Sequence, residues 1–233
     1  TGYGRHASPV FVGGRLLVHF GPLVCLDAAT GKLLWQNDKA KATYGTPAAT
    51  RIGDVDVVVT PKGHVVRLAD GQILASDLGN CMYTSPVVQD RAVFFIDGSM
   101  SAVQLPEKAG EPIECRELWS GELAGEFFAS PLVHRGRLYT VDKAGKYHVI
   151  DASTGKVVLS KKIEFTAAAG AGAGGASVYP SLCLAGKDLF VGNDAGETIV
   201  LEPGDQGSAI GSGSLPGGSG GTPTFSDRRM FVR

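Results

Sequence analysis

A short motif that recurs six times along the chain constrains the fold more than any other feature. Each copy is a residue with a hydroxyl group followed by proline, and consecutive copies begin 38 to 49 residues apart. A period of this length indicates a repeat protein, in which each repeat is one small structural unit that packs against its neighbours. The copies are Ser8-Pro9, Thr46-Pro47, Ser85-Pro86, Ser130-Pro131, Tyr179-Pro180 and Thr222-Pro223.

Within each repeat, short apolar runs alternate with polar turns. In the first repeat, the run Val10-Phe11-Val12 is followed by the turn Gly13-Gly14 and then by a second apolar run at 16–20. Runs rich in Val, Leu, Phe and Tyr, separated by turns with glycine, are typical of antiparallel strands. No long segment has the three- and four-residue apolar spacing of an amphipathic helix. Each repeat is therefore predicted to form four antiparallel strands.

A four-stranded sheet repeated at this period is the signature of a β-propeller, in which each sheet is one blade. One blade cannot bury both of its faces alone, so each blade is expected to pack against the next. We predict an all-β fold, a β-propeller of four-stranded antiparallel blades, with five complete blades and one half blade. Residues 1–233 are a single propeller domain or a fragment of one. The blades are expected at residues 8–45, 46–84, 85–129, 130–178 and 179–221, with a partial blade at 222–233.

Three segments depart from the repeat. Residues 108–114 insert charge and proline into the third repeat, which predicts a surface loop. Residues 167–176 are an Ala/Gly tract and residues 208–221 a Gly/Ser-rich stretch, and both are interpreted as mobile connectors. The chain opens in what reads as a loop and stops in mid-strand, so we interpret it as a piece of a longer protein. The lack of a signal peptide then says nothing about the compartment.

Composition excludes some classes of function. Lys and Arg total 22 and Asp and Glu total 23, which gives a net charge of −1. Nucleic-acid binding and polybasic membrane patches both need excess positive charge, so we expect no nucleic-acid partner. No run of 18 apolar residues exists, so no transmembrane segment is expected.

No residue pattern indicates a metal or catalytic site. The cysteines, Cys25, Cys81, Cys115 and Cys183, form no CxxC pair and match no metal-ligand spacing. They read as small buried apolar residues, and Cys81 with Cys115 is the only disulfide pairing considered. None of the five histidines pairs with a second ligand at i+2 or i+4. Glycine-rich matches to nucleotide-binding and hydrolase motifs, at 170–175 and 217–221, lack the helices that those motifs need.

The turn before the fourth strand carries the most specific motif. It reads Asp-x-x-Thr-Gly, followed in the first repeat by tryptophan and in the fourth by Leu159 at the same place. Aspartate, threonine and glycine build a hairpin turn with a positive φ angle, and the tryptophan is expected to lie between neighbouring blades. Both roles are structural. The motif residues are Asp27, Thr30, Gly31 and Trp35 in the first repeat, Trp119 in the third, and Asp151, Thr154 and Gly155 in the fourth.

This motif and its repetition resemble the pyrroloquinoline-quinone (PQQ) type β-propeller repeat family. The resemblance covers essentially the whole chain and implies a propeller of seven or eight blades, of which this chain is a part. Some members of the family are dehydrogenases with two adjacent cysteines and a tryptophan face beside the quinone. This sequence has no adjacent cysteines, and both of its tryptophans fall at or near docking positions. It is most similar in kind to the non-catalytic exported bacterial propellers, such as the family's outer-membrane assembly lipoprotein.

The resemblance implies three hypotheses about function. The first is a non-catalytic scaffold in the bacterial cell envelope, periplasmic or otherwise extracytoplasmic, which binds a protein or peptide partner and needs no cofactor. The alternative is a PQQ-dependent alcohol or sugar dehydrogenase with calcium, whose site is completed outside this chain. The third is a ligand-sensing or polymer-binding module. Whether the chain is an enzyme stays open. Candidate surface contacts, chosen from the expected turns, are His19, Lys62, Asp97, Lys143 and Asn193.

Overall fold

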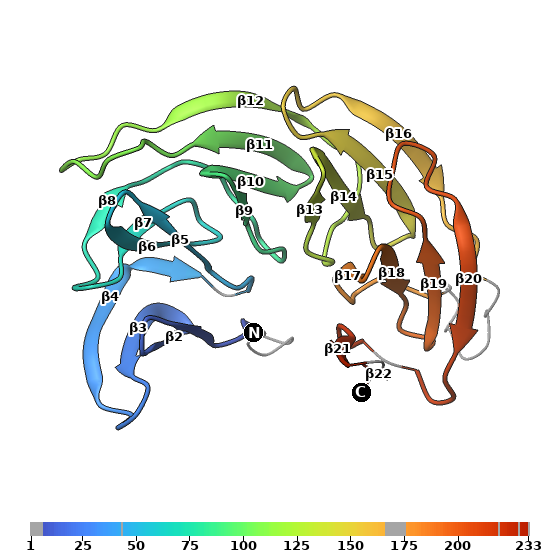
Figure 1. Ribbon diagram of the computed structural model, residues 1–233, viewed down its shortest axis with the longest axis horizontal. Helices are drawn as coiled ribbons and strands as arrows, with labels where there is room; N and C mark the ends of the chain where they lie inside the picture. Colours follow the sequence, from blue (N-terminus) through green and yellow to red (C-terminus); the bar gives the residue numbers. More distant parts are fainter. Residues whose placement is uncertain (1–6, 43, 166–175, 219, 228, 233) are drawn as a thin grey trace. The chain divides into compact units, whose positions relative to one another are not determined.

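The computed structural model describes residues 7–42, 44–165, 176–218, 220–227 and 229–232. The chain separates into two compact units, Thr1–Leu123 and Ala124–Arg233. Every strand of the described residues pairs antiparallel with its neighbour in sequence (Figure 1). The prediction of four-stranded antiparallel sheets is confirmed, with five complete sheets and one of two strands.

The first unit contains three four-stranded sheets, each in the order of the sequence. The first sheet is β1 (Val10–Val12), β2 (Arg15–His19), β3 (Gly21–Asp27) and β4 (Leu33–Ala42). The second is β5 (Ala48–Ile52), β6 (Val55–Val59), β7 (Val65–Arg67) and β8 (Ile73–Ala75). The third is β9 (Val87–Gln89), β10 (Ala92–Asp97), β11 (Ser99–Gln104) and β12 (Arg116–Glu122).

The second unit contains two four-stranded sheets and a pair of strands. The fourth sheet is β13 (Leu132–His134), β14 (Arg137–Val141), β15 (Lys146–Asp151) and β16 (Val157–Lys162). The fifth is β17 (Cys183–Ala185), β18 (Asp188–Gly192), β19 (Glu197–Leu201) and β20 (Ala209–Ser214). The pair is β21 (Thr224–Ser226) and β22 (Arg229–Phe231).

Apolar side chains of neighbouring sheets form the cores. In the first unit, Leu17 and Cys25 of the first sheet cluster with Val58 and Val66 of the second. In the second unit, strands β14 and β15 of the fourth sheet cluster with β18 and β19 of the fifth through buried Tyr, Val, Leu and Ile side chains. Within each unit, neighbouring sheets therefore bury apolar faces against each other, as the repeat requires.

The recurring hydroxyl group links neighbouring sheets at the start of their first strands. In the first unit, the backbone N–H of Ser8 donates to Oγ1 of Thr46 at 2.9 Å, and that of Thr46 donates to Oγ of Ser85 at 2.9 Å. In the second unit, Ser130 N–H donates to Oγ of Ser181 at 3.0 Å, and Ser181 N–H donates to Oγ1 of Thr222 at 2.9 Å. The motif thus satisfies a backbone donor of one sheet with the side chain of the next.

These bonds correct the fifth copy of the motif. The sequence placed it at Tyr179-Pro180, whereas the hydroxyl that takes part is that of Ser181. Ser181 lies two residues before β17, as Ser130 lies two residues before β13. The repeats were matched by their prolines alone, which placed the fifth copy two residues too early.

Three further expectations concern the segments that depart from the repeat. The loop at 108–114 is confirmed, because it lies between β11 and β12. The connector expected at 208–221 is wrong in its first half, where residues 209–214 form β20 against β19. Of the tract at 167–176, only residue 176 is among the described residues.

All four cysteines are free thiols, so Cys81 and Cys115 form no disulfide.

Candidate functional site

The Asp-x-x-Thr-Gly turns are held by the aspartate. Oδ1 of Asp27 accepts from the backbone N–H of Thr30 at 2.7 Å and from its hydroxyl at 2.6 Å, and Gly31 has a φ of +70°. Oδ1 of Asp151 accepts from the hydroxyls of Ser153 and Thr154 at 2.6 and 3.0 Å. These bonds favour the charged form, so the pKa of each carboxyl lies below its usual value, with the Thr30 and Ser153 hydroxyls as the largest causes.

The tryptophan of the first repeat lies against the turn of the second sheet. Nε1–H of Trp35 donates to the carbonyl of Leu68 at 3.0 Å. Gly71 has a φ of +77°, and a Cβ there would lie 2.6 Å from Cε3 of Trp35. In the fourth sheet, Leu159 replaces the tryptophan, and its methyl group similarly approaches Gly207 of the fifth sheet. Trp119 is buried beside Phe94, with ring centroids 6.1 Å apart.

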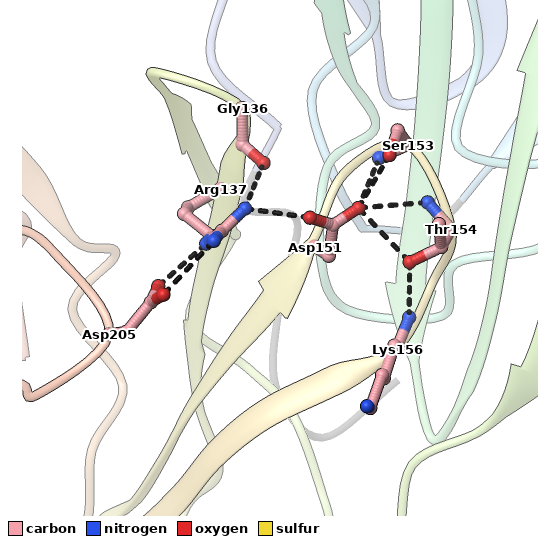
Figure 2. A network of polar contacts seen from close by, with 7 residues as sticks. All are labelled: Gly136, Arg137, Asp151, Ser153, Thr154, Lys156 and Asp205. Atoms are coloured by element: carbon pink, nitrogen blue, oxygen red, sulfur yellow. Dashed lines mark hydrogen bonds and ion pairs between the residues drawn. The ribbon is translucent and has the colours of Figure 1, made fainter.

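An arginine that the sequence analysis missed joins the fourth and fifth sheets. Figure 2 shows Arg137 between the carboxylates of Asp151, in its own sheet, and Asp205, in the turn before β20. Its Nη1 lies 2.7 Å from Asp151, while Nε and Nη2 bind Asp205 at 2.6 and 3.0 Å. This two-bond contact is the geometry in which arginine binds carboxylate best, and it lowers the pKa of Asp205. The network connects the two sheets through a single side chain.

The turns between second and third strands lie at the end of the sheets opposite to the Asp-x-x-Thr-Gly turns. They too are held by hydrogen bonds between a side chain and the backbone of the same turn. Thr60, Asp142 and Asn193 occupy equivalent places, and the side-chain oxygen of each accepts the backbone N–H four residues later. Asp97 instead accepts backbone N–H groups from the preceding connector, those of Met82 and Tyr83, the latter at 3.0 Å. The turns and connectors at this end are therefore tied together by polar bonds.

The predicted surface contacts divide into two groups. His19 and Asn193 are each only 1% exposed, so the expectation that they lie on the surface is wrong. Nε2–H of His19 donates to the carbonyl of Ala40 at 2.8 Å, and burial lowers the pKa of its imidazole. Lys62, Asp97 and Lys143 are half-buried, and each keeps part of its side chain in water.

Aromatic side chains of the connectors accompany these turns. Tyr44 and Tyr83 of the first unit have ring centroids 5.2 Å apart. In the second unit, Phe128 and Tyr179 meet edge to face at 5.2 Å, and Nζ of Lys143 lies 5.5 Å from the Phe128 ring. Each aromatic residue stands two places before a hydroxyl of the repeat, a signal that the sequence analysis did not use.

The metal-ligating side chains are scattered over the described residues. No group of three His, Cys, Asp or Glu side chains gathers among them for a metal ion. Trp35 lies against Gly71 and Trp119 beside Phe94, so both tryptophans pack against residues of the protein itself. No helix of the described residues is long and apolar enough to cross a membrane.

Comparison with known proteins places these sheets in a family. A family model, PQQ_2, described as outer membrane protein assembly factor BamB, matches residues 2–113 and 111–169. The protein of that name from Legionella pneumophila (strain Paris) is 26% identical over 200 residues, which are 79% of this chain and 47% of that protein. Its namesake from Escherichia coli (strain K12) is 27% identical over 146 residues, 58% of this chain and 36% of that protein. The chain thus spans less than half the length of these relatives.

Solved structures show the same fold. BamB from Moraxella catarrhalis superposes with a TM-score of 0.54 at 21% identity, over 94% of this chain and 75% of that chain. Quinohemoprotein alcohol dehydrogenase from Comamonas testosteroni superposes with a TM-score of 0.66 at 13% identity, over 93% and 44%. At these identities the likeness is one of fold. Together with the five four-stranded sheets, it confirms the predicted β-propeller architecture.

Proposed function

This chain belongs to the PQQ_2 family, which is described as outer membrane protein assembly factor BamB, and on this premise we propose that it is part of a non-catalytic scaffold. Its role would be to bind protein partners during the assembly of outer-membrane proteins, outside the cytoplasm, in the bacterial cell envelope. The match of the family model over residues 2–169 and the printed names of the relatives support this proposal.

The observation that carries the proposal is the cluster of Phe128, Tyr179 and Lys143 in the second unit. Tyr179 is 38% exposed and Lys143 half-buried, so both present surface to a partner. The backbone of Lys143 is anchored to both connectors, because its N–H donates to the carbonyl of Glu126 and its carbonyl accepts from the N–H of Val178. Tyrosine is among the residues that most often carry the binding energy of protein interfaces, and loops on a rigid scaffold commonly hold binding residues. Lys62 and Asp97 of the first unit are proposed as further contacts.

The dehydrogenase alternative rests on likeness of fold. The quinohemoprotein enzymes are 13% and 14% identical to this chain, identities at which only the fold is shared. No step of the proposed function runs through a quinone or a calcium ion. What the scaffold supplies is a surface whose side chains are ordered before the partner arrives, which reduces the entropy lost on binding.

The test is a binding titration with an unfolded partner of the proposed class. A fluorescently labelled outer-membrane β-barrel protein, diluted from urea, is titrated with the chain and followed by anisotropy. Saturable binding is expected, together with weaker binding by Tyr179→Ala and Lys143→Ala. The matched control is Lys187→Ala, which removes an exposed charge from the turn between β17 and β18, at the other end of the sheet. No saturation, or equal loss with the control, would contradict the proposal.

A further inference from the structure

Strand β20 is the outermost strand of the fifth sheet, and its outer edge pairs with no strand among the described residues (Figure 1). All six of its residues are exposed. An open edge of this length presents backbone donors and acceptors to any extended chain, so proteins usually protect it with charge, proline or shortness.

The other outer strands of this chain carry such protection, and β20 does not. Strand β8 has only three residues. The longer strands β4, β12 and β16 all contain charged residues, such as Lys39, Glu117 and Lys161. Strand β20 reads Ala-Ile-Gly-Ser-Gly-Ser, with neither charge nor proline. Ile210 within β20 and Leu215 directly after it are each 53% exposed.

The register tells which backbone groups face outward. The N–H of Leu215 donates to the carbonyl of Gly196 at 3.0 Å, and in an antiparallel ladder such bonds recur at every second residue. Gly213 and Gly211, opposite Thr198 and Val200, therefore face β19. Ser212 and Ser214 lie between them, so their N–H and C=O groups point away from the sheet.

We infer that the outer edge of β20 binds an extended, uncharged segment of the unfolded outer-membrane protein by strand addition. This inference rests on the proposed function and adds a second place of contact to it. Backbone bonds to Ser212 and Ser214 hold the segment in register, and Ile210 and Leu215 contact its apolar side chains. The strands of β-barrel proteins, which alternate apolar and polar side chains, have the required chemistry, because backbone bonds supply the affinity and the apolar side chains can meet Ile210 and Leu215.

The test uses the same labelled, urea-diluted β-barrel protein and two matched pairs of variants. Ser212→Pro removes an outward N–H from β20, and Lys162→Pro removes one from β16, which is outward by the same register rule. Ile210→Lys and Val158→Lys add a charge to the same two strands without altering the backbone. Both β20 variants are expected to weaken binding at least about tenfold, and both β16 variants to stay within about twofold.

Three results would overturn the inference. Equal binding by the β20 and β16 variants would remove the edge from the interface and leave the proposed function standing. No binding by the unsubstituted chain would overturn the proposed function and this inference with it. Sedimentation showing a dimer that Ser212→Pro dissociates would assign the edge to a second copy of the chain instead. A monomer in sedimentation, with loss confined to the β20 variants, supports the inference.

Discussion

The indole ring of Trp35 lies against Gly71 in the turn of the next sheet, where a side chain would collide with it. A Cβ at Gly71 would lie 2.6 Å from Cε3 of Trp35, and the φ of +77° is itself unfavourable for other residues. Gly71→Ala is therefore expected to destabilise the chain by about 2–5 kcal/mol, from backbone strain and overpacking together. Chemical unfolding measures this change.

The matched control for that substitution is Gly31→Ala. Gly31 has a similar φ of +70°, but a Cβ there would meet no atom within 4 Å. It should cost only the backbone strain, about 1–2 kcal/mol. If the two variants lose the same stability, the contact between Trp35 and Gly71 is not what the glycine is needed for.

The hydroxyl link between the fourth and fifth sheets gives a test of the corrected repeat. Ser181→Ala removes the acceptor of the Ser130 N–H and should destabilise the chain by about 1–2 kcal/mol. Tyr179→Phe also deletes a hydroxyl at the fifth copy but leaves this bond intact, so its thermal midpoint should match that of the unsubstituted chain. A larger loss from Tyr179→Phe than from Ser181→Ala would restore the original alignment.

Buried histidines make stability depend on pH near neutrality. Burial lowers the pKa of His19 and of His148 below the ordinary value, so the unfolded chain binds protons that the folded chain does not. The stabilisation that the folded chain gains from these neutral histidines is complete above about pH 6.5 and is lost as the pH falls below that value. The thermal midpoint should fall between pH 7 and pH 5, and less steeply in His19→Gln. An equal slope in both proteins would contradict this assignment.

The carboxylates around Arg137 act in a lower pH window. Bonds from Arg137 lower the pKa of Asp205, and those from Ser153 and Thr154 lower the pKa of Asp151. Their contribution is present above the unfolded value of about 3.9 and is lost as the pH falls through the folded values. Asp205→Asn should make the unfolding midpoint depend less on pH below pH 4. In the unsubstituted chain, 1 M salt should weaken the ion pair. An unchanged acid profile would contradict the role of this pair.

The strands were predictable because their apolar runs are local signals, but β20 was not. Glycine and serine have little strand preference, so residues 209–214 read as a connector. Their strand state comes from the ladder to β19, a pairing with another segment that composition does not reveal. The contact of Arg137 with Asp205 is much further apart in sequence, since 68 residues separate the two.

The sequence identified which residues lie in the turns of the candidate site, but not the direction in which their side chains point. Asn193 was correctly expected in a turn, yet its side chain folds inward because Oδ1 accepts the backbone N–H groups of Ala195 and Glu197. Lys143, in the equivalent turn of the fourth sheet, keeps its amine at the surface beside Glu126. The sequence pattern of a turn does not say which side chain satisfies the backbone and which remains available to a partner.

The most direct test of the scaffold proposal is amide hydrogen exchange of the chain with and without the unfolded β-barrel protein. Binding at the anchored turns and connectors predicts slower exchange in peptides covering residues 124–131 and 176–182, around Phe128 and Tyr179. Peptides covering the turn at Gly186, at the other end of the fifth sheet, should be unchanged. Saturable binding without slower exchange in the two connector segments would contradict the account.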